Sequence, residues 1–365
     1  MRAQQCLTAV MLGLAAPFLL ADHLPLGKGQ PHVQPSQSVA DTKLQPARIP
    51  YIDTHVHFDP KVVSDPSGQI DTALHAASNE NAATLIFMPG PYISTDPASF
   101  DYEIFVTALK KHLGRLAFEA GGGSLNPMLQ ASIRAEDSGS GVQQKFKERA
   151  EQILSAGAIG FGEMSSEHLS LTSGQVYETA PPDHPLLLLL ADIAAQHNVA
   201  IDLHLDVVPQ TIPLPLGIAS PPNPAKLQEN LAAFERLLAH NPRAKILWAH
   251  AGQDGIGYRT PDLCRRLLQA HPNLYMEIKI DPLLLGKNPP LDASSKIQPE
   301  WLALFKDFPD RFVIGSDQHY GSARFTTGPQ RWQSVILLLN QLPADLQREI
   351  ASENARRIFH LPQDN

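Results

Sequence analysis

Short apolar runs alternate with longer amphipathic stretches from residue 51 to the end of the chain. Such runs are typical of buried β-strands, and the stretches between them of helices. The strand-like runs are Tyr51–His57, Ala83–Met88, Arg115–Ala120, Ala158–Glu163, Val199–His204, Lys245–His250, Leu274–Ile280 and Phe312–Asp317. The helix-like stretches include Lys145–Ser155, Pro185–His197, Pro224–His240, Pro261–His271 and Pro299–Phe308. Eight strands separated by helices predict an α/β fold, a (β/α)8 TIM barrel forming a single catalytic domain, with an open doubly wound sheet as the competing architecture.

The first residues of the chain do not share this alternation. Arg2 precedes an apolar stretch from Leu7 to Leu20, which is too short to span a bilayer and typical of a signal-peptide core. We therefore expect a cleaved leader at residues 1–21, a disordered tether rich in Pro, Gln and His at residues 22–49, and the catalytic domain at residues 50–365. The expected location is the periplasm, or the membrane surface if the leader persists as an anchor.

Composition limits the partners. The chain has 365 residues, of which 43% are apolar and 18% charged, with a formal net charge of −8. Without a basic stripe, nucleic acid is not an expected partner, so we expect a small-molecule substrate. Once the leader is removed, Cys264 is the remaining cysteine, which excludes an intramolecular disulfide. No later stretch is long and apolar enough to span a membrane.

Histidines and carboxylates recur at the ends of the predicted strands. His55 and His57 lie two residues apart on the first strand, together with Asp53, so all three are expected to point to one face. A barrel brings the C-terminal ends of its strands together, and imidazole and carboxylate groups ligate zinc and related ions. The sequence therefore predicts a site for one or two divalent ions, zinc or alternatively manganese. Its ligands would be His55, His57, Glu163, His204, His250 and Asp317.

These residues resemble the pattern of the amidohydrolase superfamily of metal-dependent TIM-barrel hydrolases. The His55-Val56-His57 motif matches its first strand, and the C-terminal SENARRIFHLP is similar to the closing helix of the amidohydrolase-related branch. Glu163 stands where many members with two metals carry a carboxylated lysine, and in this respect the chain resembles TatD-like nucleases. On this basis His55, His57 and Asp317 would hold the deeper ion. Glu163, His204 and His250 would hold or share a second ion.

Metal-activated water makes hydrolysis the favoured chemistry, with an amide, lactone or ester bond of a small molecule as its target. Asp317 would accept the proton of that water, and His250 would polarise the substrate carbonyl if a single ion is bound. Lys279 and Arg324, near the ends of the last two strands, would bind a substrate carboxylate or phosphate. A metal-dependent non-oxidative decarboxylase of an aryl or unsaturated carboxylate is the alternative, and a phosphodiesterase ranks third.

Overall fold

A computed structural model describes residues 49–58, 65–92, 100–171, 175–281, 286–320 and 330–363. These residues belong to one compact unit, Pro46–Asn365. The predicted leader, all but the last residue of the predicted tether, and Arg324 lie outside the described residues. Within the ranges given above, none of the helices combines the length and apolar character needed to cross a membrane.

In the described residues, eight parallel strands form the central sheet, and one of them is divided into β3 and β4. Neighbouring strands follow the order β3-β2-β1-β12-β11-β10-β7-β5-β4. The strands are β1 (Tyr51–Phe58), β2 (Ala82–Met88), β3 (Leu116–Phe118) continued by β4 (Ala120–Gly121), β5 (Gly160–His168), β7 (Ala200–Leu205), β10 (Lys245–Ala251), β11 (Leu274–Ile278) and β12 (Phe312–Ile314). All eight predicted strands are present, with ends that differ by a few residues.

The ring of strands closes at Glu119, which separates β3 from β4 in one continuous segment. β3 pairs with β2, and β4 pairs with β5, so this segment joins the two ends of the strand order. The Glu119 amide donates to the Phe87 carbonyl at 2.9 Å on one side, and the Ile159 amide donates to the Phe118 carbonyl at 2.9 Å on the other. The predicted (β/α)8 barrel is therefore confirmed.

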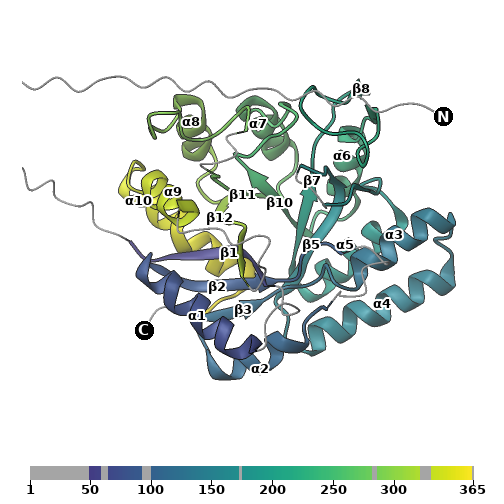
Figure 1. Cartoon of the computed structure of the whole chain (residues 1–365), viewed down its shortest axis with the longest axis horizontal. Helices are drawn as coiled ribbons and strands as arrows, with labels where there is room; N and C mark the ends of the chain where they lie inside the picture. The colour runs from purple at the N-terminus through teal and green to yellow at the C-terminus, as the bar shows by residue number, and fades with distance from the viewer. Residues whose placement is uncertain are drawn as a thin grey trace, which may run out of the picture. The chain divides into compact units, whose positions relative to one another are not determined.

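Helices lie outside the strands (Figure 1). They are α1 (Pro66–Asn79), α2 (Glu103–Lys111), α3 (Leu125–Ala135), α4 (Ser140–Ser155), α5 (Pro185–His197), α6 (Leu231–His240), α7 (Pro261–Ala270), α8 (Pro299–Asp307), α9 (Gln330–Leu339), α10 (Ala344–Arg348) and α11 (Asn354–Phe359), the last preceded by a π-helical turn at Glu349–Glu353. The boundaries of α5 agree with the prediction. Those of α7 and α8 differ from it by one residue.

The predicted start of the helix at Pro224 is wrong, because α6 begins at Leu231. The residues between them include β9 (Lys226–Leu227), which pairs antiparallel with β8 (Ile212–Pro213) in a hairpin after β7. Asn230 lies at the end of this hairpin segment. Its side chain accepts a hydrogen bond from the Val208 amide at 2.7 Å and donates to the Asp206 carbonyl at 3.0 Å. These contacts hold the chain in a loop up to the first turn of α6.

α7 shows how local sequence determines where a helix begins and which face it packs against the barrel. The Thr260 hydroxyl caps its N-terminus by accepting the Leu263 amide at 3.2 Å, and Pro261 occupies the first turn, where its missing N–H costs no hydrogen bond. Cys264, Leu267 and Leu268 are spaced three and one residues apart and are buried. Each buried leucine contributes about 1.5–3 kcal/mol, so this face binds the helix to the strands.

The C-terminal helix closes one end of the barrel. Ala355, Ile358 and Phe359 on α11 form a buried cluster with residues of six strands: Ile52, Ile86, Ala117, Ala200, Leu247 and Val313. Asn354, at the start of α11, is fully buried and donates from Nδ2 to the carbonyl of Pro309 at 2.7 Å and to that of Phe312 at 2.8 Å. This asparagine therefore ties the closing helix to the first residue of β12.

Replacing Asn354 with Ala should destabilise the fold by about 1–3 kcal/mol, because two buried carbonyls lose their donor. Urea unfolding followed by circular dichroism measures the change. Lys145→Ala, at an exposed position of α4, is the control and should stay within about 0.5 kcal/mol of wild type. An Asn354→Ala variant as stable as this control would contradict the role given to the asparagine.

Candidate metal centre

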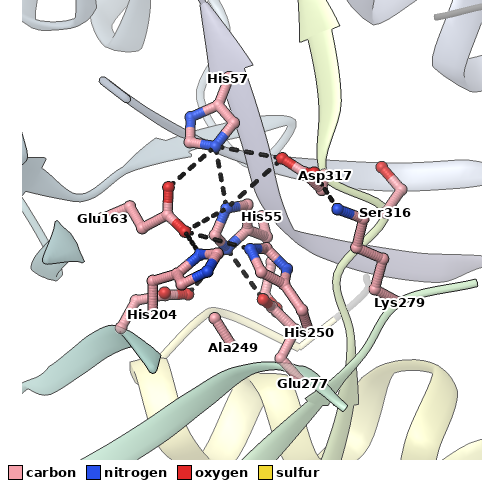
Figure 2. A network of polar contacts seen from close by, with 12 residues as sticks. His55, His57, Glu163, His204, Ala249, His250, Glu277, Lys279, Ser316 and Asp317 are labelled. Carbon is pink, nitrogen blue, oxygen red and sulfur yellow. Dashed lines mark hydrogen bonds and ion pairs between the residues drawn. The ribbon is translucent and has the colours of Figure 1, made fainter. Parts of the chain in front are cut away.

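The six predicted ligands come together at one end of the barrel (Figure 2). His55 and His57 lie on β1, while the others lie on or next to four further strands: Glu163 on β5, His204 on β7, His250 on β10 and Asp317 three residues after β12. Five of the six are buried, and His204 is nearly so. Residues separated by more than 250 positions in the chain thus share one cluster because parallel strands of a barrel end on one rim.

The distances in this cluster suit a metal ion. His57 Nε2 lies 3.1 Å from His55 Nε2, 3.2 Å from Asp317 Oδ1 and 3.3 Å from Glu163 Oε2. Tetrahedral ligands with metal bonds of about 2.1 Å are roughly 3.4 Å apart. The donor set of imidazole nitrogens and carboxylate oxygens therefore has both the chemistry and the spacing that zinc or a related ion requires.

Glu163 occupies the middle of the cluster and reaches both halves of it. Its Oε1 atom lies 2.8 Å from His204 Nδ1 and 3.1 Å from His250 Nε2, while Oε2 faces His57. A carboxylate whose two oxygens face different imidazoles can bridge two ions. The apolar run predicted that β5 ends at Glu163. The strand instead continues to His168, because β6 (Glu178–Thr179) pairs with its outer part.

The two carboxylates of the cluster are held ionised. Burial raises the pKa of Glu163, but hydrogen bonds from three imidazoles outweigh burial and keep this pKa well below the usual range. Burial likewise raises the pKa of Asp317, and the charges of Lys279 and His319 outweigh it and keep this pKa well below the usual range. Both side chains are therefore anions at neutral pH, the form that binds a cation.

Two of the candidate ligands have unusual backbone conformations. His250 has φ of 64° and Asp317 has φ of 54°, in the left-handed region that residues other than glycine rarely adopt. The amide of Asp317 donates to the His55 carbonyl at 3.0 Å, which ties this turn to β1. Strained residues persist where their surroundings fix them and are concentrated at functional sites.

Asp53 does not join the histidines, contrary to the alternation expected for its strand. Its carboxylate accepts hydrogen bonds from the Ser316 amide at 2.8 Å, the Ser316 hydroxyl at 2.6 Å and the Trp332 indole at 2.9 Å. The pairing of β1 with β2 shifts register between Asp53 and Val56, so the strict two-residue period does not hold across this segment. Asp53 links β1 to the turn after β12 and to α9.

Carboxylates that were not predicted from the sequence support His55. His55 Nδ1 lies 3.0 Å from Asp202 Oδ2 and 2.8 Å from Glu277 Oε2, and Thr54 donates its hydroxyl to Glu277 Oε1 at 2.7 Å. A ring N–H that donates to carboxylates leaves Nε2 free to bind a metal. A signal was present: Asp202 precedes His204 by two residues, and so shares its strand face.

The two residues predicted to bind substrate have different outcomes. The ammonium group of Lys279 lies against Asp317 Oδ2 and is buried, whereas Arg324 lies outside the described residues. Two further basic side chains near Asp317 were not predicted: His319 Nε2 lies 3.2 Å from Oδ1, and Arg331 Nη1 lies 3.3 Å from Oδ2. Arg331 follows a segment without a strand pattern, so its position beside Asp317 could not be predicted from the sequence.

Comparison with solved structures gives fold relatives of low sequence identity. A 4-oxalomesaconate hydratase from Rhodopseudomonas palustris has 14% identity and a TM-score of 0.50, covering 85% of this chain and 95% of its own. A zinc-bound amidohydrolase from Burkholderia multivorans has 14% identity and a TM-score of 0.47, covering 86% and 100%. A TatD homologue from Escherichia coli has 13% identity and a TM-score of 0.48, covering 86% and 98%. A search of curated proteins gave no significant match.

A family model shows the relationship directly. The model described as amidohydrolase matches residues 141–361, more than half of the chain. The match includes the positions of Glu163, His204, His250 and Asp317, and the site geometry places these beside the two histidines of β1. The chain therefore belongs to the amidohydrolase family of metal-dependent enzymes.

Proposed function

We propose that the protein hydrolyses an amide, lactone or ester bond of a small molecule with the help of two divalent ions. The observation that supports this proposal most is the position of Glu163, whose two carboxylate oxygens face His57 on one side and His204 with His250 on the other. One carboxylate placed in this way can serve two ions at once.

The remaining ligands divide into two sets around Glu163. His55, His57 and Asp317 would hold one ion, and His204 with His250 would hold the other. The nitrogen-rich donor set favours zinc, with manganese as the alternative. A divalent ion bound here supplies a Lewis acid and lowers the pKa of water from about 15.7 to roughly 7.

Asp317 is the proposed general base. It is an anion at neutral pH because Lys279 and His319 lower its pKa against the effect of burial. Its Oδ1 atom faces His57 and His319, while Oδ2 contacts the Lys279 ammonium. The carboxylate can take up a proton and return it to the leaving group. Lys279 and Arg324 remain proposed contacts for an acidic group of the substrate.

Changing Glu163 to Gln should lower the metal content from two equivalents to one, because a neutral amide cannot bridge two cations. Metal analysis of purified protein by mass spectrometry measures the stoichiometry. The His55→Ala/His57→Ala double variant should retain less metal still, since it loses both imidazoles of β1. Glu167→Gln, on the same strand with its carboxylate bonded to Tyr177 at 2.9 Å, is the matched control and should bind as wild type does. A wild-type protein that never exceeds one equivalent would refute the bridging role.

Metal binding to the apoprotein should release protons at pH 7. Burial lowers the pKa of His204, but Asp206 and Glu163 outweigh it and raise the pKa from 6.5 to about 9. The imidazole is therefore protonated at pH 7 and must become neutral to bind a metal, so apparent affinity should rise as the pH increases toward about 9. Calorimetry in buffers of different ionisation enthalpy counts the protons. Asp206→Asn should release fewer; release of none by wild type would contradict the prediction.

Asp317→Asn should reduce turnover by roughly 10²–10⁴, the usual contribution of a positioned general base. Metal content should be largely retained, and substrate affinity should change much less than turnover, because proton transfer occurs in the transition state. Steady-state kinetics on a panel of lactones, N-acyl amino acids and esters gives both parameters. Asp310→Asn, at an exposed position, is the control.

The same panel, run in ¹⁸O-labelled water and extended to aryl carboxylates, separates hydrolysis from decarboxylation. Hydrolysis must place one solvent oxygen in the acid product. Release of carbon dioxide from an aryl carboxylate, with no label in the remaining product, would replace the proposed hydrolase by the decarboxylase.

A further inference from the structure

A buried arginine reaches the two strands that carry His204 and His250. Arg259 lies between β10 and α7 and is only 3% exposed. Its Nη2 atom donates to the Leu205 carbonyl at 2.6 Å, and its Nη1 atom donates to the Ala249 carbonyl at 2.7 Å. Leu205 directly follows His204, and Ala249 directly precedes His250. The guanidinium group therefore joins β7 to β10 beside both ligands.

Arg259 bonds the two strands beyond the regular part of their ladder. β7 and β10 pair in parallel register up to Leu203 and Trp248. His250 then has a φ of 64°, which departs from the extended backbone that a parallel ladder requires. Buried carbonyls next to such a break need donors from elsewhere. The guanidinium supplies two N–H groups whose directions are fixed by its planar fork.

The neighbours of Arg259 hold its side chain in this position. Its guanidinium carbon lies 4.6 Å from the centre of the Trp248 ring, and the Trp248 indole donates to the same Leu205 carbonyl at 3.0 Å. The buried Asp254 folds the loop before α7, because its carboxylate accepts the Gly257 amide at 2.6 Å and the Arg259 amide at 2.8 Å. A side chain fixed in this way can impose one geometry on the strands that it joins.

The charge of Arg259 needs an explanation, because a cation close to a metal site opposes metal binding by Coulomb repulsion. Burial lowers the pKa of Arg259, and the carboxylates of Asp206 and Asp254 oppose this effect. A guanidinium keeps its proton in proteins, so the group is a buried cation at neutral pH. The geometry that it imposes on the two strands is a benefit that can offset this cost.

His204 and His250 must keep a fixed separation to bind the same ion. His204 Nδ1 lies 2.8 Å and His250 Nε2 lies 3.1 Å from the same Oε1 atom of Glu163, and the two ring centres are 4.8 Å apart (Figure 2). Tetrahedral ligands with metal bonds of about 2.1 Å are roughly 3.4 Å apart. A small shift of β7 along β10 would move one imidazole out of reach of an ion held by the other.

We propose that Arg259 is a positioning residue for the second ion, the one assigned to His204 and His250. It fixes the backbone beside each histidine and so sets the separation of the two imidazoles. The inference rests on the proposed two-ion function and adds to it a residue that contacts neither ion nor substrate. Lysine cannot replace it fully, because a flexible ammonium lacks the planar fork that bonds two carbonyls in one orientation.

Calorimetric titration of zinc into the metal-free protein measures the affinity of each ion, and anomalous diffraction at limiting zinc assigns each affinity to its position. Arg259→Met keeps an apolar chain over Trp248 but removes both donors. We expect it to weaken the second ion by about 10–100-fold, the usual effect of removing a group that orients a ligand. The ion of His55, His57 and Asp317 should keep its affinity. Arg259→Lys should fall between wild type and Arg259→Met, and it decides the test if Arg259→Met does not fold.

Asn354→Ala is the matched control, because it removes two buried hydrogen bonds at the other end of the barrel. It should lower stability in urea without weakening either ion. Unchanged affinity for the second ion in the Arg259 variants, or equal weakening of both ions, would overturn the positioning role. A wild-type protein that binds a single equivalent would instead refute the two-ion function on which the inference rests, so the two failures are distinguishable.

Discussion

The structure of the site depends on the need to balance charge inside the barrel. An isolated ionised carboxylate buried away from water costs more than the 5–15 kcal/mol by which a typical domain is stable, so each one needs a cation, a metal or a proton. His55 is where this constraint acts most directly, since its Nε2 faces the metal centre and its Nδ1 faces Asp202 and Glu277. A ring held on both edges has a fixed orientation and tautomer, and this positions the first ligand of the centre.

Strain and support are divided between the two ends of the barrel. At the ligand end, His250 and Asp317 adopt left-handed backbone conformations that each cost of order 1–3 kcal/mol. At the other end, Asn354 and the apolar residues of α11 close the barrel with satisfied hydrogen bonds and buried side chains. These two conformations are tolerated because His250 lies on a well-packed strand and Asp317 follows one, and they aim the imidazole and the carboxylate inward.

The strands and most helix ends could be predicted because they rest on local signals. Strands of a parallel barrel are buried on both faces and appear as apolar runs, and α5 is bounded by Pro185 at its first turn and a left-handed Asn198 at its end. The start of α6 depends on Asn230 bonding to residues about twenty positions earlier, which no local pattern reveals. The orientation of Asp53 depends on a register shift between strands. Asp202 was predictable in principle, because an acid at an inward position of a barrel strand is unusual.

Lys279 links substrate binding to the proposed base. Its ammonium contacts Asp317 Oδ2, so in the free enzyme only Oδ1 of this carboxylate faces the centre. Under the proposed function, a substrate carboxylate that pairs with Lys279 would compete with Asp317 for the ammonium and leave Oδ2, which Arg331 Nη1 still contacts at 3.3 Å, better able to accept a proton. The pKa of Asp317 would rise at the same moment, since the Lys279 charge is the largest influence that lowers it. A base that becomes stronger when an acidic substrate binds discriminates against neutral substrates of similar shape, because these leave the ion pair intact.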